Sequence, residues 1–225
     1  QRIIHLLTAQ TNSGQLYEVD MRLRPSGASG LLVSSLGAFG RYQEGEAWTW
    51  EHQALVRARV LVGCARVGAG FEAIRAQVLG RERDLPTLRG EVSEMRAKMR
   101  DNLGSPSTAA GTAANAFEAA APFDLKQDAG GIVDIEFMVQ YAALAWSREH
   151  PQLLRYTDNI RILDGLEEAA LMSSDDVRLL QEAYKAYRAA AHRQALQKQP
   201  GVVSGDQFHP ERRGVLRIWH ALGLN

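Results

Sequence analysis

The sequence has almost no cysteine and no excess of charge of either sign. Its 225 residues hold one cysteine, Cys64, which excludes an internal disulfide framework and fits a reducing compartment such as the cytoplasm. Lys plus Arg and Asp plus Glu number 26 each, so the net charge predicts neither nucleic acid nor a membrane surface as a partner. No apolar run reaches the length of a membrane span, and no signal peptide is visible. Any anion site must therefore be local.

Several common catalytic signatures are also missing. The sequence contains no P-loop, no GxGxxG and no serine elbow. Its six histidines lack metal-ligand spacing, and with one cysteine they do not predict a zinc site. Hydrophobic residues make up 45% of the chain, which is ordinary for a globular protein with a full core. The chemistry has to be sought in less common patterns.

Helical periodicity dominates after residue 35. We expect helices over 36–45, 46–63, 71–83, 86–104, 132–146, 158–172, 174–199 and 209–222. In the second of them, Ala47, Trp50, Ala54, Ala58 and Leu61 recur at spacings of three and four and predict an inward stripe. The small residues of 104–122 predict a flexible insertion. The opening "QRIIHLLTAQ" reads as the last turns of a helix, as in a piece of a longer protein. The predicted fold is mainly α, a helical bundle preceded by a short β segment.

The short β segment is "QLYEVDMRLRP", residues 15–25, where apolar and charged residues alternate with a period of two. One face then carries two acids followed by two bases. A solvated edge strand with paired charges explains this pattern. A second interpretation is that Asp20 binds a divalent cation while Arg22 and Arg24 contact phosphate, because hard cations prefer carboxylates and the guanidinium fork matches phosphate oxygens.

A second segment, "LKQDAGGIVDIEF", places Lys126 and the pair Gly130 and Gly131 just before a helix. Helix starts bind anions, and glycines let phosphate approach the backbone. The alternative is a loop whose glycines serve positive φ, with Asp134 as an ordinary first-turn acid. The "DIE" sequence does not predict a metal pair, because positions i and i+2 diverge on a helix.

A third segment, "AWTWEHQALVRAR", places Glu51 on an apolar helix face, where a carboxylate needs a partner. Arg57 and Arg59 follow on different faces, so at most one points the same way as Glu51. Spacing alone favours an ion pair between helices. Glu136 and Gln140 form a similar narrow polar stripe, which predicts an arginine of another helix or a ligand cleft beside it.

Together, "GQLYEVDMRLRPSGASGLLVSSLGAF", "YQEGEAWTWEHQALVRARVLVG", "FDLKQDAGGIVDIEFMVQY" and "DNIRILDGLEEAALMS" closely resemble the glutamine synthetase adenylyltransferase family. The wording "WEHQALVRAR" resembles the C-terminal, adenylylating half of these bifunctional enzymes. The resemblance covers nearly the whole chain except 104–122. It implies that residues 1–40 end a polymerase-β-like nucleotidyltransferase domain and that 41–225 form a helical domain.

The resemblance also implies an activity. AMP would pass from ATP to a tyrosine of glutamine synthetase with Mg²⁺, under control of glutamine and the PII signalling protein. Asp20 matches the third metal-binding carboxylate of the family, and Arg22 and Arg24 would meet the triphosphate. The remaining nucleotide-side candidates are Glu51, Arg57, Arg59, Lys126, Gly130, Gly131 and Asp134. The Gly-Ser turn and Asp-x-Asp strand of the family are absent, which predicts no catalysis by this chain alone.

Two alternatives stay open. The chain could be a non-catalytic helical module that docks PII or glutamine synthetase. It could also resemble the PII uridylyltransferases, which share a Lys–Gly-Gly–Asp segment, although "WTWEHQALVRAR" argues against them.

Overall fold

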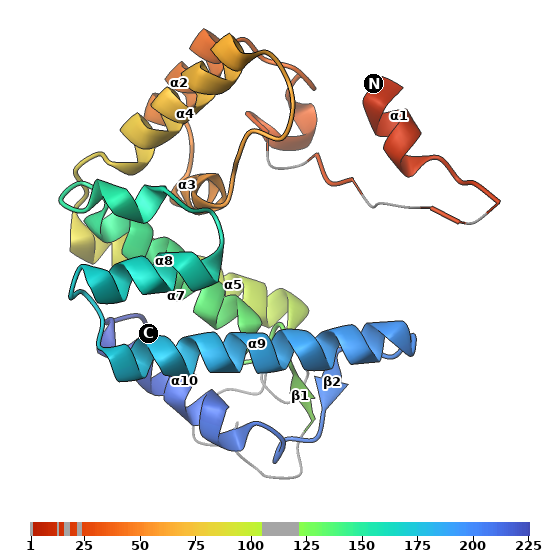
Figure 1. Cartoon of the computed structure of the whole chain (residues 1–225), viewed down its shortest axis with the longest axis vertical. Coiled ribbons are helices and arrows are strands. Elements are labelled where there is room, and N and C mark those ends of the chain that lie inside the picture. The colour runs from red at the N-terminus through yellow and green to blue at the C-terminus, as the bar shows by residue number, and fades with distance from the viewer. Residues whose placement is uncertain (1, 13, 16–18, 22–23, 105–121) are drawn as a thin grey trace.

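A computed structural model describes residues 2–12, 14–15, 19–21, 24–104 and 122–225. The described residues are mainly α-helical, as predicted, and include one small sheet (Figure 1). The elements in chain order are α1 (Arg2–Thr8), η1 (Gly27–Ser29), α2 (Leu36–Gly45), α3 (Thr49–Val56), α4 (Ala65–Leu79), α5 (Leu85–Leu103), β1 (Phe123–Asp124), α7 (Ile132–Trp146), η2 (Pro151–Leu154), α8 (Asn159–Glu168), α9 (Ser174–Leu196), β2 (Val202–Val203) and α10 (His209–Ala221). Among the described residues, no helix is both long enough and apolar enough to cross a membrane.

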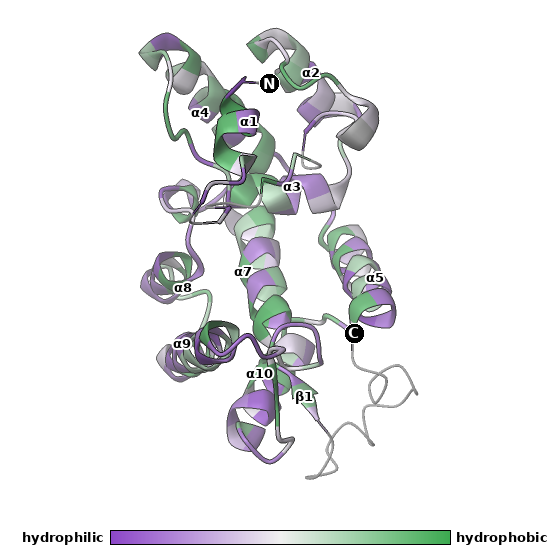
Figure 2. Cartoon of the chain, turned by 90° about the vertical axis from the view of Figure 1, so that its right-hand side faces the viewer, coloured by the Kyte–Doolittle hydropathy of each residue, from purple (hydrophilic) through white to green (hydrophobic). Residues whose placement is uncertain are grey.

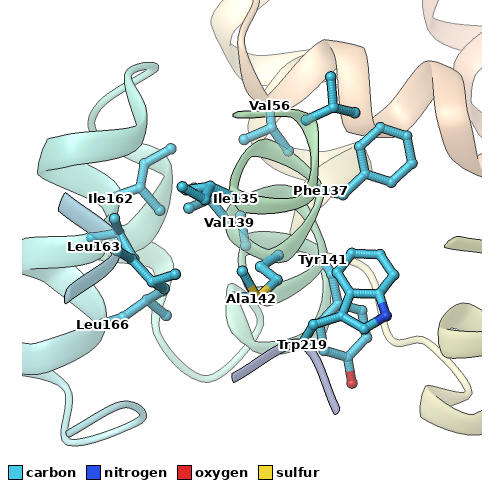
Figure 3. Packing of buried hydrophobic residues seen from close by; sticks show 14 of the residues in the cluster. Val56, Ile135, Phe137, Val139, Tyr141, Ala142, Ile162, Leu163, Leu166 and Trp219 are labelled. Carbon is cyan, nitrogen blue, oxygen red and sulfur yellow. The ribbon is translucent and has the colours of Figure 1, made fainter. Parts of the chain in front are cut away.

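Helix α7 is the centre of the fold, with α5 on one side and α8 and α9 on the other (Figure 2). Its apolar side chains are buried nearly all round, which explains why its sequence shows little amphipathic pattern. Ile135 and Val139 point toward Leu163 of α8, while Val56 of α3 and Trp219 of α10 pack at other sides (Figure 3). Burial of this helix supplies much of the hydrophobic stabilisation.

Local sequence signals set several helix starts. The hydroxyl of Ser35 accepts a hydrogen bond from the backbone N–H of Ala38 at the start of α2. Ser173 caps α9 in the same way, and two acids in the first turn complement the helix dipole. The bounds of α2 and α7 match the sequence prediction.

The helix predicted over 46–63 is wrong in length, because α3 covers only Thr49–Val56. The buried guanidinium of Arg75, in α4, donates to the carbonyl oxygens of Leu55 (3.1 Å) and Val56 (2.8 Å). These hydrogen bonds satisfy carbonyl oxygens of the last turn, so the helix can end there without leaving buried acceptors unpaired. The inward stripe therefore fails at Leu61, whose side chain is 80% exposed. Helix α4 begins at Ala65, six residues earlier than predicted, after the connection that follows the shorter α3.

The strand predicted over 15–25 is not present in the residues of that stretch that the structure describes. Residues 16–18 and 22–23 lie outside the described part, as does nearly all of the insertion predicted over 104–122. The sheet of the fold is instead β1 with β2, an antiparallel pair with Phe123 opposite Val203. This strand pairing joins the segment before α7 to the segment before α10 (Figure 1).

Candidate functional site

Glu51 and Arg57 line the same cavity, of about 350 Å³, bounded by α2, α3 and α4. We call it the α2–α4 cavity. The side chains of Gln43, Phe39 and Phe71 also line it. Arg59 is exposed and lines a neighbouring, more apolar groove. The prediction that at most one of the two arginines accompanies Glu51 is therefore confirmed, and Arg57 is the one.

The carboxylate of Glu51 is held by neutral donors rather than by the arginine that spacing favoured. The hydroxyl of Tyr42 donates to its two oxygens at 2.8 and 3.1 Å, and the backbone N–H of Trp48 donates at 2.9 Å. Burial, assisted by the hydrogen bond to Glu51, raises the pKa of Tyr42 above its ordinary value. Glu51 thus caps the start of α3 and ties it to α2.

Arg57 connects the α2–α4 cavity to the central helix. Its guanidinium lies 3.5 Å from Glu136 of α7 and donates to the side-chain oxygen of Asn159 at 3.3 Å. The hydroxyl of Tyr184 also donates to Glu136, at 3.3 Å. Of the two neighbours predicted for the Glu136 stripe, an arginine or a ligand cleft, the structure has the arginine, which lies at the C-cap of α3.

In the opening segment, residues 15–25, the structure describes the predicted metal ligand, Asp20, and one of the two predicted phosphate contacts, Arg24. Asp20 is exposed, and Arg22 lies outside the described residues. The guanidinium of Arg24 donates to the carbonyl oxygens of Gly30 (3.2 Å) and Met21, so it braces the turn that follows. Among the described residues, no three His, Cys, Asp or Glu side chains are grouped so that they could bind a metal ion.

The glycine pair before α7 has a packing reason. Gly130 has φ of +80°, and a Cβ there would lie 2.9 Å from the carbonyl oxygen of Arg212. A Cβ on Gly131 would lie 2.8 Å from the carbonyl oxygen of Leu125. Lys126 is exposed. These contacts favour the alternative interpretation of the segment, in which the glycines serve the turn itself.

The backbone donors at the start of α7 are already used within the chain. The N–H of Gly130 donates to Asp134 at 2.6 Å, and those of Ile132 and Val133 donate to the carbonyl oxygens of Leu125 (2.9 Å) and Lys126 (3.2 Å). An anion site at a helix start needs such donors to be free. Phosphate binding by this segment stays a prediction that these hydrogen bonds do not favour.

Asp134 belongs to a buried ion pair that the sequence analysis missed. Its carboxylate lies 2.5 Å from Arg96 of α5 and 3.6 Å from Arg100, and both Asp134 and Arg96 are wholly buried. Desolvation lowers the pKa of Arg96, and the Asp134 charge acts in the opposite direction. One signal was available, because Arg96 continues the inward spacing of Leu88 and Val92 at intervals of four.

Two further buried polar residues stabilise the region around α3. Arg75 donates to Leu154 at 2.9 Å in addition to the end of α3, so it joins α3, α4 and η2. The ring Nε2–H of His52 donates to the carbonyl oxygen of Gln43 at 2.9 Å. Burial lowers the pKa of His52 from its ordinary 6.5 to about 4, and the nearby charge of Arg83 lowers it further.

Comparison with known proteins covers the whole chain. The family model described as glutamate-ammonia ligase adenylyltransferase matches residues 1–74, and that of GlnD PII-uridylyltransferase matches residues 93–201. The chain is 80% identical to a bifunctional glutamine synthetase adenylyltransferase/adenylyl-removing enzyme of Pseudomonas syringae, over 100% of the chain and 23% of that relative. Its identity to the enzymes of the same name is 79% in Pseudomonas aeruginosa, over 100% of the chain and 23% of the relative, and 55% in Nitrosococcus oceani, over 99% and 22%. The chain therefore spans less than a quarter of the length of these relatives, and the family resemblance is confirmed.

Proposed function

We propose that this chain, which belongs to the glutamine synthetase adenylyltransferase family, is part of an enzyme that transfers AMP from ATP to a tyrosine of glutamine synthetase. The observation that carries the proposal is the 80% identity over the entire chain. The chain matches 23% of that relative, so the activity belongs to the longer protein. The "WEHQALVRAR" sequence supports an assignment to the adenylylating half within this proposal. Glutamine and the PII protein would regulate it in the cytoplasm.

The nucleotide would lie between the opening segment and the helical body. Asp20 would be one Mg²⁺ ligand, and Arg22 and Arg24 would meet the triphosphate. The shared cavity of Glu51 and Arg57 supports a binding region on the α3 side. Within this proposal a nucleotidyltransferase domain ends at residue 40, a boundary that α2 crosses, and the helical domain covers 41–225.

The residues described here do not by themselves make a magnesium site. Asp20 is the one predicted carboxylate ligand, and no group of three possible metal ligands is found among the described residues. A bound Mg²⁺ usually needs one or two carboxylates together with substrate phosphates. The remaining ligands would come from the longer protein, and the metal would neutralise the departing pyrophosphate.

The decisive experiment uses the longer protein that contains this chain. It is incubated with ATP labelled in the α-phosphate, Mg²⁺ and unadenylylated glutamine synthetase. We expect label on a tyrosine of the synthetase, located by digestion and mass spectrometry, and no label without the enzyme. Absence of transfer with a folded enzyme, with or without glutamine and PII, would refute the proposal.

Uridylyl transfer to PII is the second candidate, because the uridylyltransferase family model matches residues 93–201. The same assay with labelled UTP and PII in place of the synthetase separates the two. The identity to adenylyltransferases extends over the whole chain, whereas the uridylyltransferase match covers part of it. We therefore expect transfer from ATP and none from UTP.

The 225-residue chain alone should transfer no AMP, because a single predicted metal ligand leaves the triphosphate without its cation. The assay is the one above, with the isolated chain replacing the longer protein. Retained binding of labelled glutamine synthetase or PII by the inactive chain would show that its helices also act as a docking module. Label on the synthetase above the no-enzyme background would contradict the prediction.

A further inference from the structure

Gln43 is a buried amide in the wall of the α2–α4 cavity that the proposed function has not used. It lies in the last turn of α2, and its side chain is 5% exposed. Its side-chain oxygen is buried and has no hydrogen-bond partner in the described part of the chain. A buried polar group without a partner carries an uncompensated desolvation cost. A ligand that pairs with this amide would recover that cost.

The rest of the cavity suits a flat, partly polar ring. Phe39 and Phe71 line it, with ring centroids 5.7 Å apart. Its volume of about 350 Å³ is at the lower end of the range for ligand pockets, roughly 300–1,000 Å³. It can hold a heterocyclic base, while a ribose and phosphates would extend outside. Glu51 is less available for a ligand, because its carboxylate already accepts hydrogen bonds from Tyr42 and Trp48.

The cavity lies beside the turn that carries a predicted phosphate contact. Tyr42 precedes Gln43 in α2, and the backbone N–H of Ser26 acts on its hydroxyl to lower its pKa, against the larger effect of burial. Ser26 follows Arg24 by two residues, and Arg24 braces this same turn through Gly30. The turn that carries Arg24 therefore lies against α2, the helix that supplies Gln43 to the cavity.

We propose that the α2–α4 cavity binds the adenine base of ATP and that Gln43 reads its amino edge. The inference rests on the proposed AMP transfer and adds its specificity-determining residue. A glutamine amide can pair with adenine by accepting from N6 and donating to a neighbouring ring nitrogen. The side-chain oxygen is covered in the structure, and because the terminal torsion of glutamine is broad, the amide can turn to present both atoms to a base. The rings of Phe39 and Phe71 cover the apolar surface of the base.

The test compares ATP with purine riboside triphosphate, which lacks only the 6-amino group, in the longer protein that contains this chain. We expect kcat/KM for nucleotidyl transfer to be about tenfold to a hundredfold lower with the analogue, because one good base contact is worth roughly 1–3 kcal/mol. The substitution Gln43→Met keeps the side-chain volume and removes the amide. It should abolish most of the preference by raising KM for ATP, with kcat at saturating ATP little changed.

Gln53→Met is the matched control. Gln53 is equally buried, and its side-chain oxygen also has no partner in the described part of the chain, but it lies outside the cavity and donates to Gln140. This variant should keep the wild-type preference for ATP. An unchanged preference in Gln43→Met of normal thermal midpoint, or an equal loss in Gln53→Met, would overturn the inference.

If Gln43→Met does not fold, the comparison of ATP with the analogue in the wild-type enzyme still tests the inference. Equal kcat/KM for ATP and the analogue would overturn it without any variant. Active transfer without base preference refutes the adenine site alone, whereas absence of any transfer refutes the proposed function. In that second case, competition of ATP and the analogue for a fluorescent nucleotide still measures the base preference, and equal affinities would refute the site.

Discussion

Helices α1 and α7 are both rich in apolar residues, yet they are in opposite environments. In α1 no residue is buried, and Leu6 is 77% exposed. In α7 the apolar side chains are covered by five neighbouring helices, and Leu144 is 1% exposed. Composition alone therefore does not decide burial, because the surrounding elements do. Stability is concentrated in the helical body, whereas the opening segment can change without loss of the core.

The largest stability effect should come from Asp134→Asn, inside the body. The substitution leaves the wholly buried charge of Arg96 without its carboxylate partner, and breaking such a pair costs about 3–5 kcal/mol. The free energy of unfolding in urea measures it. Glu94→Gln breaks the exposed pair with Lys98 in α5 and should leave the free energy of unfolding almost unchanged. Similar losses of unfolding free energy in both variants would contradict the view that buried contacts of α7 stabilise the helical body more than exposed ion pairs do.

Acid should weaken the body through His52. The folded pKa of about 4 lies below the ordinary 6.5, so between these values the unfolded chain binds a proton that the folded chain excludes. The contribution of neutral His52 to the free energy of unfolding is fully present above pH 6.5. It falls by about 3 kcal/mol as the pH drops to 4, and it changes little below that pH.

Urea unfolding of the wild type and of His52→Gln at several pH values between 7 and 4 measures this loss. Glutamine can still donate to the Gln43 carbonyl and does not titrate. The variant should therefore lose less stability over this range than the wild type. Parallel curves for the two proteins would assign the acid sensitivity to other groups.

In the opening segment, Asp20→Asn should affect activity and hardly affect stability. An exposed carboxylate contributes under about 1 kcal/mol, so the thermal midpoint should be nearly unchanged. In the longer protein, turnover should fall on the order of a hundredfold if the carboxylate binds Mg²⁺, as loss of one strong electrostatic contact commonly does. Near-normal turnover at saturating Mg²⁺ would leave Asp20 as part of a solvated segment.

The smallest effect should come from Leu6→Ala in α1. Its side chain is already exposed, so the free energy of unfolding should change by no more than about 0.5 kcal/mol. The same substitution at Leu144, in α7, should cost roughly 2–5 kcal/mol. Paired urea titrations of the two variants test the comparison directly. A loss above 1 kcal/mol at Leu6 would show that α1 is covered in solution.

Periodicity predicted the helices whose signals are local. The bounds of α2 and α7 followed from the pattern, and the N-cap of α9 from its Ser and Asp residues. The early end of α3 was not predictable, because its cause is Arg75, distant in the sequence and on another helix. The strand expected around Asp20 rested on alternation alone, and a strand also needs a neighbour to pair with.

The candidate site was predictable in part for the same reason. Sequence placed Glu51 and Glu136 on apolar helix faces and so required partners for both. It named an arginine correctly for Glu136, because Arg57 points from the end of one helix to the face of another. It did not name Tyr42 as the partner of Glu51. A neutral hydroxyl donor adds no charge to the sequence, so charge patterning cannot reveal it.

The close approach of main chain at Gly130 and Gly131 bears on how variation among relatives should be interpreted. Any side chain at either position would meet a carbonyl oxygen at less than 3 Å, so selection for folding alone would preserve both glycines. Their invariance in a set of relatives would thus be no argument for a bound phosphate. Lys126 is exposed and is not required by this packing, so substitutions tolerated there are the informative ones for nucleotide binding.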